Sequence, residues 1–135
     1  MEQNQLNVTL KALPDTSLSS GQLKLYAFAD NEQLVGFTEL YNYDPVNRRA
    51  AVGIVVSNEY RHHGYGTAII NQLTSFCQEN TSLHQLYADI TVTNIPSIHI
   101  FRKAGYQHCA TLHDWVMRAN KYIDTLRFQL ILPES

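Results

Sequence analysis

The feature that most constrains the fold is an abrupt change of periodicity after residue 56. Residues 50–56 (AAVGIVV) are apolar on both faces, which is typical of a strand in the middle of a sheet. After a loop over 57–66, apolar residues recur at helical spacing: Ile69, Leu73, Phe76 and Cys77. The sequence therefore predicts a central strand, a loop, and a helix that begins near Tyr65 or Gly66 and ends near Asn80.

Several other segments alternate polar and apolar residues or lie between turn residues, as strands do. They are residues 8–13, 22–29, 34–43, 85–92, 106–116 and 126–132. A second helix should begin at Asn94-Ile95-Pro96, because proline suits a first helical turn, and end at Gly105, a common cap. The predicted order β-β-β-β-α-β-α-β-β gives an α/β fold, in one domain over residues 1–135, with a sheet of mixed direction.

Composition narrows the function classes. Of the 135 residues, 44% are hydrophobic and 16% are charged, as expected for a packed globular domain. The formal net charge is −2, which does not indicate a nucleic-acid-binding protein. The first residues are polar, without the apolar core of a signal peptide, and no apolar run is long enough to cross a membrane. We expect a cytoplasmic protein that binds neither nucleic acid nor membranes.

The loop Arg61-His62-His63-Gly64-Tyr65-Gly66-Thr67 has the features of an anion site. The first N–H groups of a helix have no internal partner and lie at the positive end of the helix dipole. Glycines at 64 and 66 remove the Cβ atoms that would keep a phosphate away from the backbone. Arg61 adds a positive charge and the Thr67 hydroxyl adds a donor. The loop predicts a pyrophosphate site.

A tight turn without a ligand would also use two glycines beside a helix start. The mononucleotide loop Gly-x-x-x-x-Gly-Lys-Ser/Thr is absent, and the dinucleotide fingerprint fails because Ile69 stands where its third glycine or alanine belongs.

His108, Cys109 and His113 form the best metal cluster, but adjacent strand residues point to opposite faces. We expect no metal site.

Two motifs resemble those of the GNAT N-acetyltransferases. Residues 61–66 (RHHGYG) match the pattern Arg/Gln-x-x-Gly-x-Gly/Ala, and residues 94–106 (NIPSIHIFRKAGY) resemble the family's second motif. Together with the segment from Asp114-Trp115 to the last strand, they are most similar to the spermidine and ribosomal-protein acetyltransferase branch. The resemblance covers about residues 22–132. It implies a mostly antiparallel sheet of about seven strands with two main helices, and acetyl-CoA as cosubstrate.

The resemblance also implies roles for individual residues. Strand 54–56 would splay from its parallel neighbour 87–92, and the pantetheine arm would lie in the gap. The amide of Val55 or Val56 would face the thioester carbonyl and stabilise the oxyanion. The residues implied to contact the cosubstrate are Ile54, Val55, Val56, Arg61, His62, His63, Gly64, Tyr65, Gly66, Thr67, Asn94, Ser97, Phe101 and Lys103.

The acceptor would be a primary amine on a polyamine, a protein N-terminus or a small metabolite. An alkyl amine is mostly protonated at pH 7, so a base is expected. Asp89 matches a glutamate base of some relatives, and Glu39 is the second candidate. For each, the alternative is a solvated or ion-paired carboxylate. Tyr41 is expected either on the acceptor side or in the core.

The chain departs from the family at two places. Phe101 stands where many relatives have a tyrosine that protonates the CoA thiolate, so the thiolate would leave unaided or through a water ordered by Ser97. Relatives also carry two helices between the first two strands, where this chain has only Pro14–Gly21. The acceptor site is therefore open, completed by a second subunit, or lost. A non-catalytic acyl-CoA-binding module is the alternative function, and a homodimer would cover the sheet edges.

Overall fold

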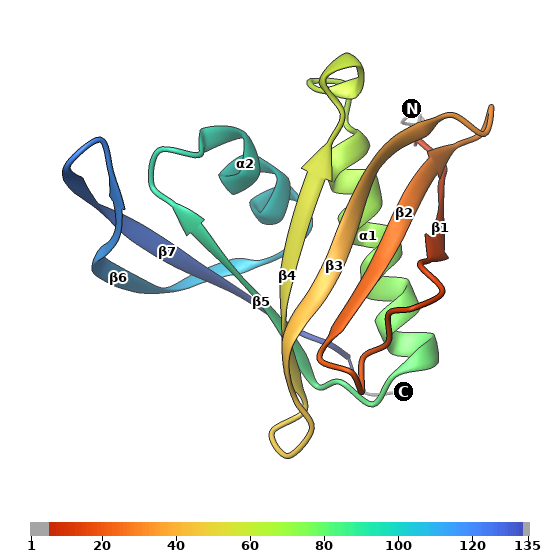
Figure 1. Cartoon of the computed structure of the whole chain (residues 1–135), viewed down its shortest axis with the longest axis horizontal. Helices are drawn as coiled ribbons and strands as arrows, with labels where there is room; N and C mark the ends of the chain where they lie inside the picture. The colour runs from red at the N-terminus through yellow and green to blue at the C-terminus, as the bar shows by residue number, and fades with distance from the viewer. Residues whose placement is uncertain (1–5, 134–135) are drawn as a thin grey trace.

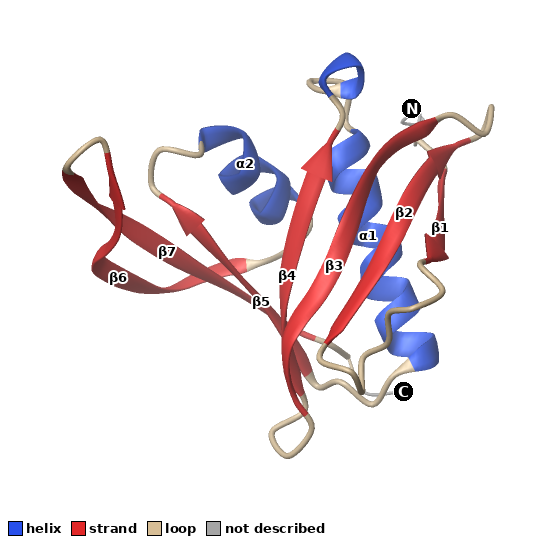
Figure 2. Cartoon of the chain, in the orientation of Figure 1, coloured by secondary structure: helices blue, strands red, loops and turns tan. Residues whose placement is uncertain are grey.

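A computed structural model describes residues 6–133 as a seven-stranded sheet with two helices (Figures 1 and 2). The strands are β1 (Val8–Ala12), β2 (Gln22–Ala29), β3 (Leu34–Asp44), β4 (Arg49–Val56), β5 (Gln85–Thr91), β6 (Gln107–Arg118) and β7 (Lys121–Ile131). The helices are α1 (Tyr65–Asn80) and α2 (Ile95–Lys103), and a 3₁₀ turn, η1 (Asn58–Tyr60), lies in the loop before α1. The predicted element order is confirmed.

The strand order is β1-β2-β3-β4-β5-β7-β6, and only β4 and β5 run parallel. The predicted mixed, mostly antiparallel sheet is therefore confirmed. The last hairpin differs from the prediction, because β7 begins at Lys121 and not near residue 126. Ala119 and Asn120 have φ of 49° and 62°, which is the backbone of a two-residue hairpin turn that lets pairing start at once.

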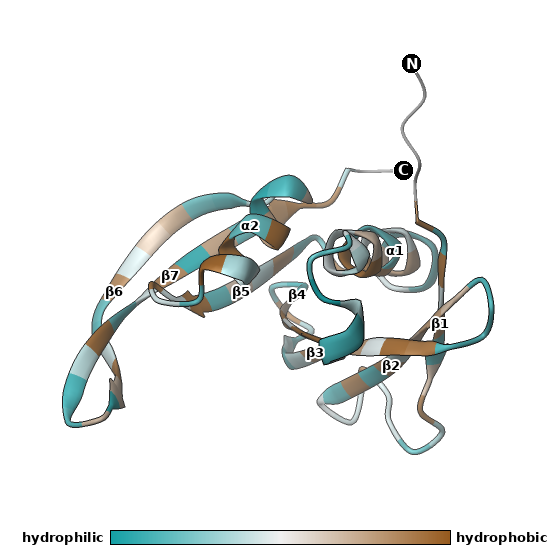
Figure 3. Cartoon of the chain, turned by 90° about the horizontal axis from the view of Figure 1, so that it is seen from above, coloured by the Kyte–Doolittle hydropathy of each residue, from teal (hydrophilic) through white to brown (hydrophobic). Residues whose placement is uncertain are grey.

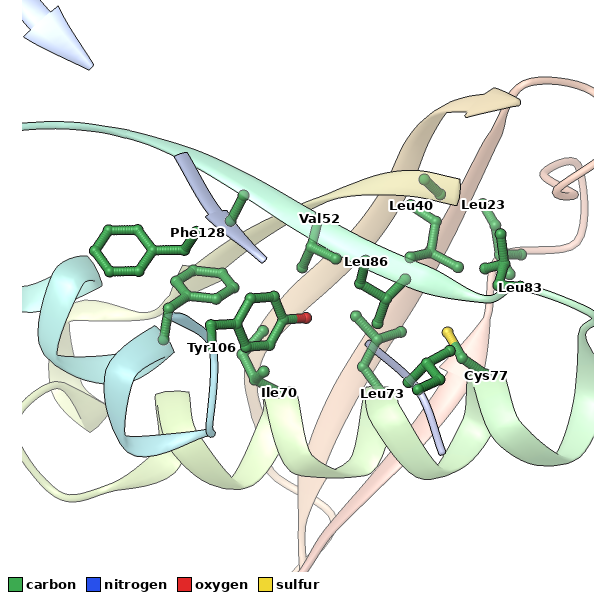
Figure 4. Packing of buried hydrophobic residues seen from close by; sticks show 14 of the residues in the cluster. Leu23, Leu40, Val52, Ile70, Leu73, Cys77, Leu83, Leu86, Tyr106 and Phe128 are labelled. Carbon is green, nitrogen blue, oxygen red and sulfur yellow. The ribbon is translucent and has the colours of Figure 1, made fainter. Parts of the chain in front are cut away.

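Both helices pack on the same face of the sheet (Figure 3). Strand alternation directs Leu23, Leu40, Val52, Leu86 and Phe128 toward the helices, where they are buried (Figure 4). From α1, the periodic residues Ile69, Ile70, Leu73 and Cys77 are each fully buried. Ile70, Leu73 and Cys77 complete the main core, whereas Ile69 packs in a second cluster with Val8, Ala27 and Val35. We call the other face of the sheet, which neither helix covers, the open face.

The register aligns the side chains of the open face in rows across the strands. One row contains Gln22, Tyr41, Ala51 and Tyr87, and the next contains Lys24, Glu39 and Gly53. Between β1 and β2 the described chain contains turns and an isolated bridge from Ser17 to Gln22 but no helix. The lack of a helix between β1 and β2 agrees with the short connection in the sequence, and it leaves the open face of the sheet uncovered. Within residues 6–133, neither helix has the length and apolar character that crossing a bilayer requires.

Candidate functional site

The two parallel strands separate after a short paired segment. β4 and β5 pair at Arg49 with Gln85, Ala50 with Leu86, and Ala51 with Tyr87, and no further pair follows. Beyond these pairs the strands diverge (Figure 1). The predicted splay between 54–56 and 87–92 is therefore present. It leaves two stretches of strand edge without a sheet partner.

The ladder identifies which β4 amides face this gap. The Ser57 N–H donates to the Val35 carbonyl at 2.9 Å, and hydrogen-bonded pairs alternate along an antiparallel ladder. Val55 is therefore bonded to Phe37 on β3, whereas the amides of Ile54 and Val56 point away from β3 into the gap. Of the two alternative amides, Val55 or Val56, only that of Val56 faces the gap, and the amide of Ile54 faces it as well. A contact of either amide with a thioester stays a prediction.

A cleft of about 750 Å³ lies between the end of β4 and the N-terminal ends of both helices. Eleven of its lining residues were expected from the sequence: Ile54, Val55, Val56, Arg61, His62, Gly64, Tyr65, Gly66, Thr67, Asn94 and Ser97. His63, Phe101 and Lys103 do not line it, nor do Asp89 and Glu39. The structure thus brings the two sequence motifs together at one cavity.

The N-terminal end of α1 presents free amides to this cleft. The first helical bond runs from the Ala68 N–H to the Gly64 carbonyl at 3.2 Å, so the amides of Tyr65, Gly66 and Thr67 have no partner within the helix. Gly64 is the N-cap with φ of 90°, and no side chain caps the helix. Glycine is favoured there because its left-handed backbone is strained for other residues. This geometry suits an anion.

Gly66 has a different role from the one that the loop pattern suggested. A Cβ on residue 66 would collide with Ile100 of α2, whose Cδ1 and Cγ1 already fill that position. Gly66 is itself buried. The missing side chain at residue 66 therefore lets α1 and α2 approach each other. Of the two glycines, only Gly64 has the predicted role of leaving the backbone accessible to a phosphate.

Arg61 is fixed against the strand end. Its Nε–H donates to the Val56 carbonyl at 3.0 Å, which leaves the Val56 N–H free on the same side of β4. His62 has φ of 65°, a left-handed conformation that is uncommon for residues other than glycine. Of the side chains that line the cleft, Arg61 is cationic and none is a carboxylate. The charge of the lining therefore favours an anionic ligand.

Two residues implied to contact the cosubstrate, Asn94 and Phe101, have structural contacts of their own. Asn94 Oδ1 accepts a hydrogen bond from the Ser97 N–H at 3.3 Å, so Asn94 caps the helix. The Phe101 side chain is 2% exposed and packs edge-on against Tyr106 at 4.9 Å between ring centroids. Burial raises the pKa of Tyr106. Phe101 belongs to the core, whereas Ser97, one turn earlier, lines the cleft.

The two candidate bases lie on the open face in different environments. Arg127 donates to both Asp89 oxygens, at 2.7 and 2.9 Å, and this partner raises the pKa of Arg127. Glu39 Oε2 accepts a hydrogen bond from Gln22 Nε2 at 2.6 Å. Within residues 6–133 no basic side chain forms an ion pair with Glu39. Asp89 is thus charge-compensated, and Glu39 is not.

Tyr41 lies near both carboxylates and is half-buried. Burial raises the pKa of Tyr41, and the charges of Asp89 and Glu39 raise it further. Its side chain belongs to the open face and not to the core between the sheet and the helices. The expectation that Tyr41 lies on an acceptor side stays a prediction.

Five lining residues were not identified from the sequence: Tyr60, Ile95, Pro96, His99 and Ile100. Four of them lie on α2, where helical spacing from Asn94 predicts which positions share a face. Tyr60 packs edge-on against Tyr65 at 5.5 Å. No motif marks it, because the turn that places it forms only in the folded loop.

Comparison with known proteins agrees with this geometry. The model of the acetyltransferase (GNAT) family matches residues 6–106. The spermidine N(1)-acetyltransferase of Vibrio cholerae is 22% identical over 100 residues, which are 74% of this chain and 58% of that protein. The Escherichia coli K12 enzyme of the same name is 27% identical over 99 residues, 73% of this chain and 53% of that protein. The chain therefore spans between half and three-fifths of these relatives.

Solved structures show the same fold. The Vibrio cholerae spermidine N-acetyltransferase in complex with CoA and spermine superposes with a TM-score of 0.79 at 19% identity, over 84% of this chain and 68% of that one. A chimera of the Vibrio enzyme with hSSAT superposes with a TM-score of 0.82 at 18% identity, over 93% and 95%. Because the family model spans most of the sheet, α1 and α2, the chain belongs to the GNAT acetyltransferase family.

Proposed function

We propose that this protein transfers an acetyl group from acetyl-CoA to a primary amine by direct attack within a ternary complex. The observation that carries the proposal is the cleft at the N-terminal end of α1, whose lining includes Ile54, Val55 and Val56, beyond the last residue of β4 that pairs with β5. Free amides, one fixed arginine and no lining carboxylate suit a pyrophosphate. Family membership and the CoA-bound relative support the same cosubstrate.

In this proposal the pantetheine arm lies along the unpaired edge of β4. The amides of Ile54 and Val56 face the gap, and an N–H aimed at the thioester carbonyl would stabilise the oxyanion as the amine attacks. Binding both reactants at one gap would supply the advantage of proximity. Ser97 lines the cleft and could order the water that protonates the departing thiolate.

Of the two candidate bases, Glu39 is favoured. A base must accept a proton from the amine, and the Asp89 carboxylate is already bound by two donors of Arg127. Glu39 has one neutral donor, Gln22. Polyamines are one class of acceptor in this proposal, since the spermidine acetyltransferases are among the relatives; protein N-termini and small amines are others.

Two measurements test the proposal. CoA at 100 times its dissociation constant should stabilise the protein by about 2.7 kcal/mol, which a thermal-shift assay detects. Thiol release from acetyl-CoA should then depend on an added amine, measured over a panel of polyamines, peptides and simple alkyl amines. The Glu39→Gln variant should keep the thermal shift and lose most of the turnover. Absence of any CoA-dependent shift would reject the cleft as the cosubstrate site.

The alternative is a non-catalytic acyl-CoA-binding module. It is favoured by Phe101, which has no proton to donate and lies in the core away from the cleft. It predicts the same thermal shift with CoA but no turnover with any amine.

A further inference from the structure

Two histidines line the cleft from two different elements. His62 belongs to the loop that precedes α1, and His99 lies on α2. The packing of the helices fixes the place of His99, because the next residue, Ile100, fills the space beside Gly66 in the first turn of α1. His99 therefore lies next to the turn whose amides are free, and the two imidazoles share one cavity with those amides.

Both imidazoles are available to a ligand. The His62 and His99 side chains are exposed, and among the described residues neither has a hydrogen-bond or ion-pair partner. In contrast, His108 Nε2 lies 3.0 Å from the Ala110 carbonyl oxygen, and His113 Nδ1 lies 3.1 Å from Asp124 Oδ2. An imidazole without such a partner can adopt the charge that its ligand favours.

The surroundings of the two imidazoles are positive. The ionisable neighbours are Glu59, Tyr60, Arg61 and His63 on the loop side, and Tyr65, Arg102 and Lys103 on the helices. Of these, only Arg61 and the two tyrosines line the cleft, and β4 contributes no titratable side chain to it. Phenols are uncharged near pH 7, so the guanidinium and the positive end of the α1 dipole dominate. Positive neighbours oppose protonation of an imidazole, whereas a bound phosphate favours it.

We infer that His62 and His99 bind the phosphate groups of the cosubstrate as imidazolium ions, so that binding takes up protons and weakens as the pH rises. This rests on the proposed binding of acetyl-CoA at the cleft. Arg61 and the α1 amides supply donors of constant charge, and the imidazoles supply donors whose charge depends on pH. No covalent bond of the cosubstrate changes, since each proton passes from water or buffer to a ring nitrogen and returns when the ligand leaves.

The sign of the pH dependence separates the protein from its ligand. The proton is held more tightly in the complex than in the free protein, so the contribution is complete below about pH 6.5, the usual value for histidine, and is lost as the pH rises. The phosphate monoester of CoA loses its second proton at about pH 6. Its charge grows with pH, which by itself would strengthen binding. Weaker binding at higher pH is therefore a property of the protein.

Isothermal titration of the wild-type protein with CoA tests this linkage without requiring turnover. The dissociation constant should rise about fivefold to tenfold between about pH 6.5 and about pH 8.5. Titrations in two buffers of different ionisation enthalpy should show net proton uptake. A dissociation constant that is independent of pH, or that falls as the pH rises, would overturn the inference. Absence of CoA binding at every pH would instead reject the proposed function itself.

Variants assign the linkage to the two histidines. Asparagine tolerates the left-handed backbone of residue 62, where φ is 65°, and glutamine suits a helix. His62→Asn and His99→Gln should each reduce the proton uptake. The double variant should bind CoA about fivefold more weakly than wild type at about pH 6.5, with little further change up to about pH 8.5.

His113→Gln is the control, because this imidazole lies on β6, outside the cleft, and is bound to Asp124. It should keep the wild-type pH profile, and thermal unfolding without ligand checks that each variant is folded. If the double variant retained the wild-type pH dependence, or if His113→Gln abolished it, His62 and His99 would not be the groups that take up the protons.

Discussion

Arg127 binds Asp89 through two parallel hydrogen bonds, from Nε at 2.7 Å and from Nη2 at 2.9 Å. The same guanidinium lies 4.7 Å from the centroid of the Tyr87 ring. The bridge joins neighbouring positions of β5 and β7, and the Arg127 side chain is 38% exposed. A partly exposed bidentate pair of this kind stabilises a fold modestly. Its geometry supports a structural role for Asp89.

The Asp89→Asn variant should therefore unfold at lower urea concentration, with a loss of about 1 kcal/mol, while turnover stays within about threefold of wild type. Arg127→Met should give a similar loss of stability. Urea unfolding and steady-state rates measure both effects. A large fall of kcat in Asp89→Asn, without loss of stability, would assign Asp89 the base role in place of Glu39.

Gly66→Ala should destabilise the protein by about 1–3 kcal/mol, because the new methyl group would overlap Ile100 at the contact between α1 and α2. Truncation of the second partner removes the obstacle, so the double variant Gly66→Ala with Ile100→Ala should be less destabilised than the sum of the single variants. Denaturant unfolding of the wild type, the two single variants and the double variant measures this coupling in a double-mutant cycle. Additive effects would show that the contact does not limit residue 66.

Val56→Pro should reduce kcat by about 10²-fold, since it removes an N–H that faces the gap. The β3–β4 ladder uses the alternate amides, so the sheet should remain paired and the CoA-induced thermal shift should persist. Rate and thermal shift are measured on the same preparation. An unchanged kcat would identify Ile54 as the sufficient donor.

Phe101→Tyr should lower stability by about 1–3 kcal/mol, because the hydroxyl would enter the core without a partner. Turnover should stay within about twofold, since residue 101 does not line the cleft. Thermal unfolding and steady-state rates distinguish the two effects. A large rise of kcat would mean that the ring reaches the departing thiolate in the complex.

The cysteines should differ in reactivity. Cys109 is exposed and Cys77 is buried, and burial raises the pKa of the Cys77 thiol to about 12. A thiol reagent at pH 8 should label Cys109 quickly and Cys77 only after unfolding, with Cys109→Ser as the control. Since the pKa of Cys77 is raised in the folded state, its contribution to stability is present below the unfolded pKa of about 8.5 and is lost as the pH rises toward 12. Rapid labelling of two thiols in the folded protein would contradict this burial.

Local pattern was sufficient for the element order and for the loop of the site at residues 61–67. The apolar strand 50–56, the helical spacing after Gly64 and the proline at the start of α2 each act within a few residues, so the sequence contains them directly. The same holds for the free amides at the start of α1, since every helix has them. That both motifs contact one cosubstrate was implied only by the resemblance to the GNAT family, and the cleft that both motifs line agrees with it.

Tertiary structure alone decided which of the similar residues has which role. In the sequence, Asp89 and Glu39 are both acidic residues and both candidates for the base. Only the pairing of β5 with β7 brings Arg127 to Asp89. Gly64 and Gly66 belong to one motif, but only the packing of α2 against α1 shows that Gly66 is needed for the contact between the two helices. Which β4 amides face the gap depends on which residue pairs of the β3–β4 ladder are hydrogen-bonded. In each case the deciding contact joins residues far apart in the chain, and a short-range pattern does not encode it.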